Sequence, residues 1–158
     1  MNLTDREIKL KYGRSDDADD YLISLAGKYK YSSLPPEERR KALCYIKHFW
    51  TGEAYGHRAG VVYICRYPEV DWWTLDAYRD DDVLKEINTK GNYSYRAGKL
   101  VIDWFFEKKI AEDLLTMHDE RNRAATLVCQ KLGFEEDGFI QNFIRLKLRR
   151  STWESRQS

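Results

Sequence analysis

The sequence predicts a single domain of the α/β (α+β) class, because segments with helical spacing alternate along the chain with segments of strand spacing. Residues 124–132 carry apolar side chains at three- and four-residue steps, which places them on one face of a helix. Residues 144–148 instead alternate apolar and basic side chains, as a strand with one buried face does. With 158 residues, of which 42% are hydrophobic, the chain is long enough to bury one core. We therefore expect one domain at 1–150 and a polar, frayed tail at 151–158.

The same two patterns predict the other elements. Ile8 and Leu10 alternate with charged residues before Gly13, which indicates a strand and then a turn into a helix. In the first half of the chain we expect a strand at 7–12, helices at 17–26 and from Pro35 to about Trp50, and strands at 61–65 and 70–78. A short helix at 83–88, ended by Gly91 and Asn92, should follow. In the second half we expect a helix entered at Gly98, a strand at 110–118, a helix from Asp119 and a hairpin at 137–148.

The charge of the chain argues against a partner chosen by bulk electrostatics. Lysine and arginine number 27 against 26 aspartate and glutamate residues, so we expect no general affinity for nucleic acid. No apolar run approaches the roughly 20 residues that a membrane span needs, and the N-terminus lacks the pattern of a signal peptide. We expect a cytoplasmic protein without a membrane partner.

The three cysteines suggest neither a disulfide nor a metal site. Cys44, Cys65 and Cys129 are odd in number, lie within apolar patterns and lack the CxxC spacing of zinc sites. We expect buried free thiols and no metal. Aromatic residues make up 14% of the chain, which fits a core, with a pocket or an interface as the alternative.

Residues 118–134 combine a helix start, an apolar face and a helix end. Asp119 is expected to cap the helix, because its carboxylate can accept hydrogen bonds from the free amides of the first turn. Leu127 and Val128 fall on the apolar stripe, so we expect them to be buried. Gly133 can adopt the left-handed conformation that ends a helix.

Within this helix, Asn122, Ala125 and the ending Lys131–Phe134 have the spacing Asn-x-x-Ala followed by a Gly-Phe turn. This pattern resembles the fourth helix and the following turn of the GNAT family of N-acetyltransferases. The resemblance implies that Asn122 contacts the pantetheine arm of acetyl-coenzyme A, with Ala125 at the same site. A helix residue that merely faces solvent is the alternative.

A second segment, at 93–108, has a small residue at the expected entry of an apolar helix. Free amides and the positive dipole end make a helix N-terminus a site for a pyrophosphate. Aligned on this helix, the segment resembles the GNAT cofactor loop, Gln/Arg-x-x-Gly-x-Gly/Ala, but Arg96 replaces the first glycine and Tyr93 replaces Gln or Arg. The residues implied to bind the cofactor are Tyr95, Arg96, Ala97, Gly98 and Lys99. An ordinary junction between a loop and a helix is the alternative.

The GNAT resemblance also implies an architecture and a cofactor. The architecture is a mixed, mostly antiparallel central sheet with helices on both faces. The strand at 110–118 would be the family's fifth strand, which splays away from the fourth so that the cofactor arm enters between them. The cofactor is acetyl-coenzyme A, or coenzyme A.

Acetyl transfer to an amine needs a base and commonly an acid. Asp76 and His118, each near the end of an expected strand, are the candidate bases by position, and a merely polar strand end is the alternative for either. Cys129 stands where many members of the family have a tyrosine acid. Packing of a buried thiol is the alternative there.

The resemblance thus implies an acetyl-coenzyme A-dependent N-acetyltransferase acting on an amine of a small molecule, peptide or protein, with a homodimer as a further expectation. The competing hypothesis is a catalytically inactive GNAT-like binding or structural protein, such as a virion or head-assembly component of a tailed phage with other virion proteins as partners. Arg96 separates the two: it would either contact a phosphate or fill the phosphate space beside an acidic partner.

Overall fold

The computed structural model describes residues 1–29, 31, 36–87 and 90–157. The elements are β1 (Leu3–Thr4), β2 (Ile8–Tyr12), α1 (Asp16–Gly27), α2 (Pro36–Ala42), the 3₁₀ helix η1 (Leu43–Tyr45), β3 (Ile46–Ala54), β4 (His57–Tyr67), β5 (Trp72–Arg79), α3 (Asp81–Glu86), α4 (Lys90–Glu107), β6 (Asp113–Asp119), α5 (Arg123–Leu132), β7 (Glu135–Ile140), β8 (Phe143–Arg149) and α6 (Arg150–Gln157).

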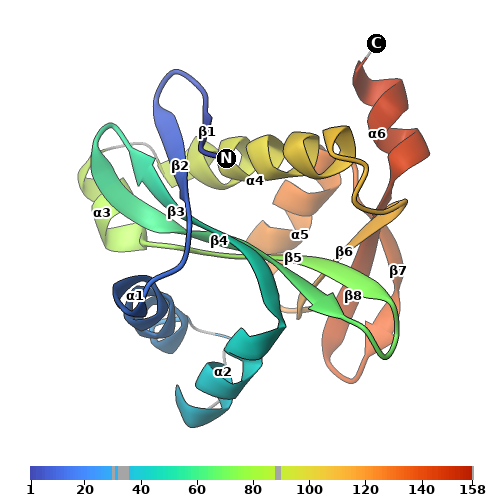
Figure 1. Cartoon of the computed structure of the whole chain (residues 1–158), viewed down its shortest axis with the longest axis horizontal. Helices are drawn as coiled ribbons and strands as arrows, with labels where there is room; N and C mark the ends of the chain where they lie inside the picture. The colour runs from blue at the N-terminus through green and yellow to red at the C-terminus, as the bar shows by residue number, and fades with distance from the viewer. Residues whose placement is uncertain (30, 32–35, 88–89, 158) are drawn as a thin grey trace.

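The strands form one twisted sheet in the order β1-β2-β3-β4-β5-β6-β8-β7. Neighbouring strands run antiparallel except β5 and β6, which are parallel. Helices α4 and α5 cover one face, and α1 and α2 cover the other (Figure 1). The predicted mixed, mostly antiparallel sheet with helices on both faces is therefore confirmed.

Each face of the sheet has its own hydrophobic core, because the strands alternate their side chains between the two faces. Under α4 lie large buried side chains, among them Trp50, Ile64, Phe105, Leu114 and Leu146. Under α1 lies a smaller cluster of Ala18, Leu22, Leu25, Leu43, Phe49 and Val61. Two cores on one sheet leave the central strands covered on both sides.

The helix expected from Pro35 to Trp50 is wrong in its second half. Helix α2 ends at Ala42, and the chain becomes strand β3 at Ile46. Phe49 is buried under α1 and Trp50 under α4, so β3 has apolar residues on both faces. Such a strand lacks the alternation of a half-exposed strand, and its apolar run reads like a helix. Pro35 lies outside the described residues.

The two helices with the family motifs also begin elsewhere than predicted. Helix α4 starts at Lys90, so Gly91 and Asn92 open it instead of ending a helix, and Gly98 lies well inside it. Helix α5 starts at Arg123 with Asn122 as its cap, not Asp119. Asp119 ends β6 and accepts hydrogen bonds from Arg121 instead. Helix ends depend on which residue meets the sheet, which spacing alone leaves open.

Three further expectations about burial and order are corrected. Leu127 is 65% exposed, and no residue of α5 is fully buried. Cys44 is exposed, while Cys65 is buried as predicted. Residues expected to fray after Arg149 form α6, since Trp153 Nε1 donates to Asp103 at 2.9 Å and its ring stacks on Phe106. One anchored aromatic orders a helix that is otherwise polar.

Among the described residues, no helix is both long enough and apolar enough to span a membrane.

Candidate functional site

The parallel strands β5 and β6 diverge at the centre of the sheet. Within the described chain Thr74 and Leu115 are their one aligned pair. Just beyond it, the Thr116 hydroxyl donates to the Leu75 carbonyl at 2.9 Å and closes the base of the gap. The two strands point in the same direction but diverge beyond this pair, so their carboxyl ends form the two walls of an opening. The separation of these two strands is the splay that the family resemblance predicted.

A cavity of about 250 Å³ occupies this opening. The end of β5 contributes Asp76, Ala77, Tyr78 and Arg79, and the end of β6 contributes Thr116, Met117, His118 and Asp119. Helix α4 contributes Ala97 and Gly98, α5 contributes Ala125, Val128 and Cys129, and the chain after α1 contributes Tyr29 and Tyr31. The cavity therefore receives side chains from both faces of the sheet.

The cavity explains why α5 is not fully buried. Its inward side chains, which the sequence placed in a core, border a hollow, although Cys129 and Leu132 also pack against the core under α4. Gly98 allows α4 to lie close to α5, because a Cβ atom at this position would stand 3.0 Å from Leu132 Cδ1. The half-buried stripe of α5 is thus a wall of the site.

Asp76 is the acidic group on the α1 side of the cavity. On β5 it pairs with Tyr63 of β4, which packs against the α1 cluster. Burial raises the pKa of the Asp76 carboxyl to about 6, although the Thr74 hydroxyl, 3.3 Å away, favours the ionised form. A carboxylate that titrates close to neutral pH can exchange protons with a ligand.

His118 lies on β6, on the α5 side. Its Nε2 atom is 2.7 Å from the hydroxyl of Thr126 in α5. Burial lowers the pKa of His118, and the neighbouring Asp119 carboxylate opposes this effect. The imidazole is therefore mainly neutral at physiological pH.

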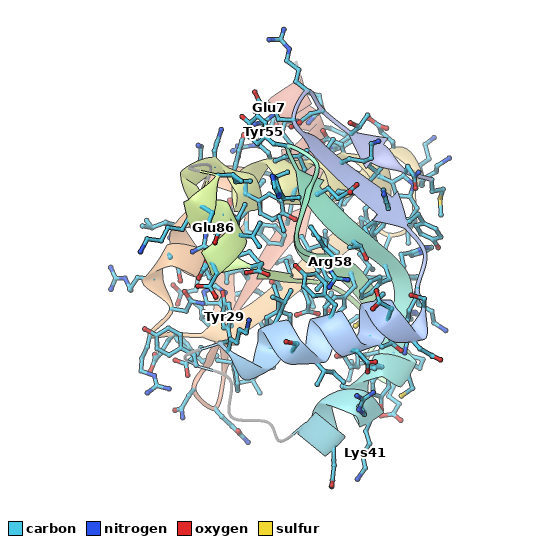
Figure 2. The ribbon with its side chains drawn as sticks, turned by 90° about the vertical axis from the view of Figure 1, so that its left-hand side faces the viewer. Glu7, Tyr29, Lys41, Tyr55, Arg58 and Glu86 are labelled. Carbon is cyan, nitrogen blue, oxygen red and sulfur yellow. The ribbon has the colours of Figure 1, made fainter. Side chains whose placement is uncertain are left out.

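Cys129 and Asn122 belong to α5. Burial raises the pKa of the Cys129 thiol to about 12, so this thiol is protonated at neutral pH. Asn122 Oδ1 accepts from the Ala125 amide at 3.2 Å and caps the helix, while Nδ2 donates to the Tyr29 hydroxyl at 3.4 Å. One side chain thus connects the start of α5 to the chain that follows α1, where Figure 2 shows Tyr29.

No protein-family model matches the sequence, and no curated protein matches it. An acetyltransferase from Agrobacterium tumefaciens has a similar structure, with a TM-score of 0.75 at 12% identity over 94% of each chain. A GNAT-family acetyltransferase from Bacillus anthracis has a TM-score of 0.71 at 9% identity, over 96% of this chain and 99% of its own. The Campylobacter jejuni N-acetyltransferase PseH, solved with acetyl coenzyme A, has a TM-score of 0.62 at 15% identity, over 90% and 98%. This chain has the GNAT fold.

The resemblance to GNAT proteins read from residues 96–102 and 122–134 is therefore confirmed at the level of the fold. Seven of the ten predicted site residues line this cavity: Asp76, Ala97, Gly98, His118, Asn122, Ala125 and Cys129. They come from β5, α4, β6 and α5, which only the fold brings together.

The other three predicted residues, Tyr95, Arg96 and Lys99, do not line the cavity. The expected GNAT loop at 96–99 is helix, so its amides bond within α4 and are not free for a phosphate. Lys99 pairs with Asp103 at 2.8 Å, and the Lys131 ammonium lies over the Tyr95 ring at 4.3 Å. These side chains lie outside the site because helical periodicity turns them away from Ala97 and Gly98.

Arg96 fits neither of its two expected roles. Its guanidinium donates to Asp5 and to Glu7 in the turn between β1 and β2. These partners raise the pKa of Arg96 further and hold it on the outer surface of the fold. Figure 2 shows Glu7 of this turn next to Tyr55, which lies in the turn between β3 and β4. Arg96 therefore neither fills the cavity nor is free for a phosphate.

Sequence reasoning missed the aromatic side of the site. Tyr29, Tyr31, Tyr78 and Phe143 line the cavity together with the predicted residues. The high aromatic content was the one available signal, and it gave no positions. No group of three or more metal-binding side chains gathers anywhere in the described part of the chain.

Proposed function

We propose that this protein is an acetyl-coenzyme A-dependent N-acetyltransferase that acetylates an amine of a small molecule, peptide or protein. The observation that carries the proposal is the cavity between β5 and β6. It brings Asp76, whose carboxyl group has a pKa of about 6, to the same space as Asn122. Similarity to acetyltransferases of known structure supports it, since those proteins share the fold in which the cavity forms.

The residues of the α4 and α5 wall suit the arm of acetyl-coenzyme A. Small side chains at Ala97, Gly98 and Ala125 leave room beside an apolar surface. The side-chain NH2 group of Asn122 donates a long bond, 3.4 Å, to the Tyr29 hydroxyl while Oδ1 caps α5, so an N–H of this group is available to a ligand carbonyl. When bound, acetyl-coenzyme A supplies an acetyl group activated as a thioester.

Asp76 is the proposed general base. With a pKa of about 6 it is mostly ionised at neutral pH and can accept a proton from the amine, whose nitrogen then bonds to the acetyl carbon. His118 is the second candidate base, but its Nε2 is already engaged by Thr126.

We assign Cys129 to the wall of the cavity and not to acid catalysis. A thiol with a pKa of about 12 is a weaker acid than an ordinary thiol, whose pKa is about 8.5, so proton transfer from Cys129 to a leaving thiolate would be uphill. The geometry favours a packing role for Cys129.

A cellular location and an assembly state are proposed together with this function. We propose that the protein acts in the cytoplasm, on an amine acceptor, as a monomer or homodimer. The alternative function, an inactive virion or head-assembly component with other virion proteins as partners, is favoured by two observations: acidic residues hold Arg96, and the motif loop is helical.

Binding of acetyl-coenzyme A tests the proposal directly. Calorimetry should give a dissociation constant below about 1 mM, because weaker binding corresponds to only about 4 kcal/mol. Ala125→Trp should abolish binding by filling the cavity, whereas Leu127→Trp, on the exposed face of the same helix, should not. Asn122→Asp should weaken binding but keep the helix cap, since a carboxylate oxygen can still accept from Ala125.

Transfer itself is measured by thiol release with a panel of amines. Release that depends on an amine and is lost in Asp76→Asn supports the enzyme. Binding of acetyl-coenzyme A without any transfer would leave the inactive GNAT-like protein standing, and absence of binding in the wild type would reject the cofactor.

A further inference from the structure

We infer that the acceptor is a small primary amine with one positive charge and an aromatic body, held on the α1 side of the cavity with its nitrogen at Asp76. This inference rests on the proposed acetyltransferase function and names the acceptor class for it. It follows from the charges and the rings that the described residues place around the cavity.

The charges favour a single ammonium group. Two acidic residues, Asp76 and Asp119, are among the described lining residues. Asp119 is already held by Arg121, whose Nη2 and Nε atoms lie 2.7 and 3.0 Å from its carboxylate oxygens, and also accepts from the Arg121 amide. Among the described residues, the Asp76 carboxylate has one hydrogen-bond partner, the neutral hydroxyl of Thr74. One carboxylate is therefore available to one cation.

An acceptor with a second ammonium group would find no free carboxylate for it among the described lining residues. Arg79, the basic residue in the wall, is paired with Asp81 at 2.6 Å and adds positive potential. A polyamine would have to leave an ammonium group partly desolvated beside it, which is unfavourable. The site is thus suited to a monoamine.

The rings favour an aromatic body. Tyr78 lies two residues from Asp76 on β5, so alternation places both side chains on the α1 face. The Tyr29 ring meets the Tyr78 ring edge to face, with centroids 5.3 Å apart at 87°. Phe143, on β8, lines the cavity and is 40% exposed. A flat apolar ligand can pack against these rings in the offset or edge-on geometry that aromatic groups prefer.

The ammonium end gains from the same rings. A cation beside the face of a tyrosine is attracted by the ring quadrupole, and Asp76 supplies the full opposite charge. Asp76 then takes one proton from the ammonium group, and the freed lone pair of the nitrogen forms the bond to the acetyl carbon. The bond from that carbon to sulfur breaks with its electron pair on sulfur, and the second proton, which the nitrogen loses as the amide forms, passes to this thiolate. Recognition and proton transfer therefore use one carboxylate.

The test compares four acceptors at saturating acetyl-coenzyme A: phenethylamine, hexylamine, spermidine and a short peptide with a free N-terminus. We expect kcat/KM for phenethylamine to exceed each of the others by at least tenfold. A preference for spermidine or for the peptide would overturn the inference, as would equal rates for phenethylamine and hexylamine.

Variants locate the acceptor. Phe143→Ala should raise KM for phenethylamine at least fivefold with little change in kcat, whereas Phe139→Ala, also exposed on the same hairpin but outside the cavity, should match the wild type. Tyr29→Phe should retain the preference for phenethylamine, and Tyr29→Leu should lose it. Equal effects of the two phenylalanine variants would place the acceptor elsewhere.

Calorimetry separates this inference from the proposed function. Acetyl-coenzyme A binding without a preference for aromatic amines would reject the acceptor class and leave the acetyltransferase proposal intact. No acetyl-coenzyme A binding would reject both.

Discussion

Arg96 of α4 grips Asp5 of the first turn with two parallel hydrogen bonds, Nη2 to Oδ1 at 2.8 Å and Nε to Oδ2 at 2.9 Å. Glu7 is bound by the remaining nitrogen, Nη1. The residue that the sequence placed in a cofactor loop instead fastens the N-terminal hairpin to a helix. Charge-assisted bidentate pairs of this kind are stronger and more specific in geometry than single bonds.

Removing this clamp should therefore cost stability and leave cofactor binding unchanged. For Arg96→Met, which keeps the helix and the apolar stem, we expect a loss of about 1.5 to 3 kcal/mol in urea unfolding, the range for hydrogen bonds to charged groups. Lys99→Met breaks the more exposed pair with Asp103 and should lose less than about 0.5 kcal/mol. If folded Arg96→Met bound acetyl-coenzyme A more weakly than the wild type, Arg96 would contribute to the cofactor site.

The titration of Asp76 predicts the pH dependence of both activity and stability. Its pKa is about 6 in the folded protein and 3.8 for an aspartate in water, so burial favours the protonated form. The wild type should lose stability relative to Asp76→Asn as the pH rises from about 4 to 7, by about 3 kcal/mol, since each pKa unit is worth about 1.4 kcal/mol. Chemical unfolding of both proteins across this range measures the difference.

Catalytic activity should increase with pH over the range in which stability decreases. Activity needs the ionised base, so kcat/KM should rise with pH through an apparent pKa near 6, as the folded carboxyl loses its proton. A profile that is flat between pH 5 and 7 in the wild type would exclude Asp76 as the base.

Helix α5 should tolerate truncation on its outer face. Leu127 is 65% exposed, so Leu127→Ala should cost less than about 0.5 kcal/mol, as surface substitutions do. Leu114→Ala, at a position with no exposed surface, should cost about 2 to 5 kcal/mol. A large loss at Leu127 in the monomeric protein would mean that α5 is oriented differently.

The Tyr93 hydroxyl is buried without a hydrogen-bond partner in the described structure, and it lies beside Gly52 of β3. Because an unpaired buried polar group costs about 1 to 3 kcal/mol, Tyr93→Phe should be neutral or stabilising. Gly52→Ala should be strongly destabilising, since its Cβ would lie 2.0 Å from the Tyr93 oxygen.

The double variant makes this prediction specific. In Gly52→Ala with Tyr93→Phe the nearest ring carbon is 3.3 Å from the new Cβ, so part of the loss should be recovered in thermal unfolding. Strict additivity of the two changes would show that the hydroxyl is not the obstacle.

The sequence by itself determined the features that depend on neighbouring residues. The turn after Gly13 leads into α1 as predicted, and Gly133 ends α5 in the left-handed conformation with φ 104°. The alternation at 144–148 predicted β8. A glycine helix end and a half-buried strand follow local rules, so they can be read without the fold. The cap of α5, predicted at Asp119 and found at Asn122, could not be read in this way.

The tertiary structure decided what depends on the surroundings of a residue. It made β3 from a segment with helical spacing, because both faces of that strand are covered. It turned Arg96 outward to Asp5 and left Leu127 in solvent. Above all, it placed a hollow where the stripe of α5 predicted a core: β5 and β6 separate after Thr74, and only the sheet fixes that point. Amphipathic spacing shows which face of a helix points inward, but whether packed side chains or a ligand cavity lies there depends on the path of distant strands.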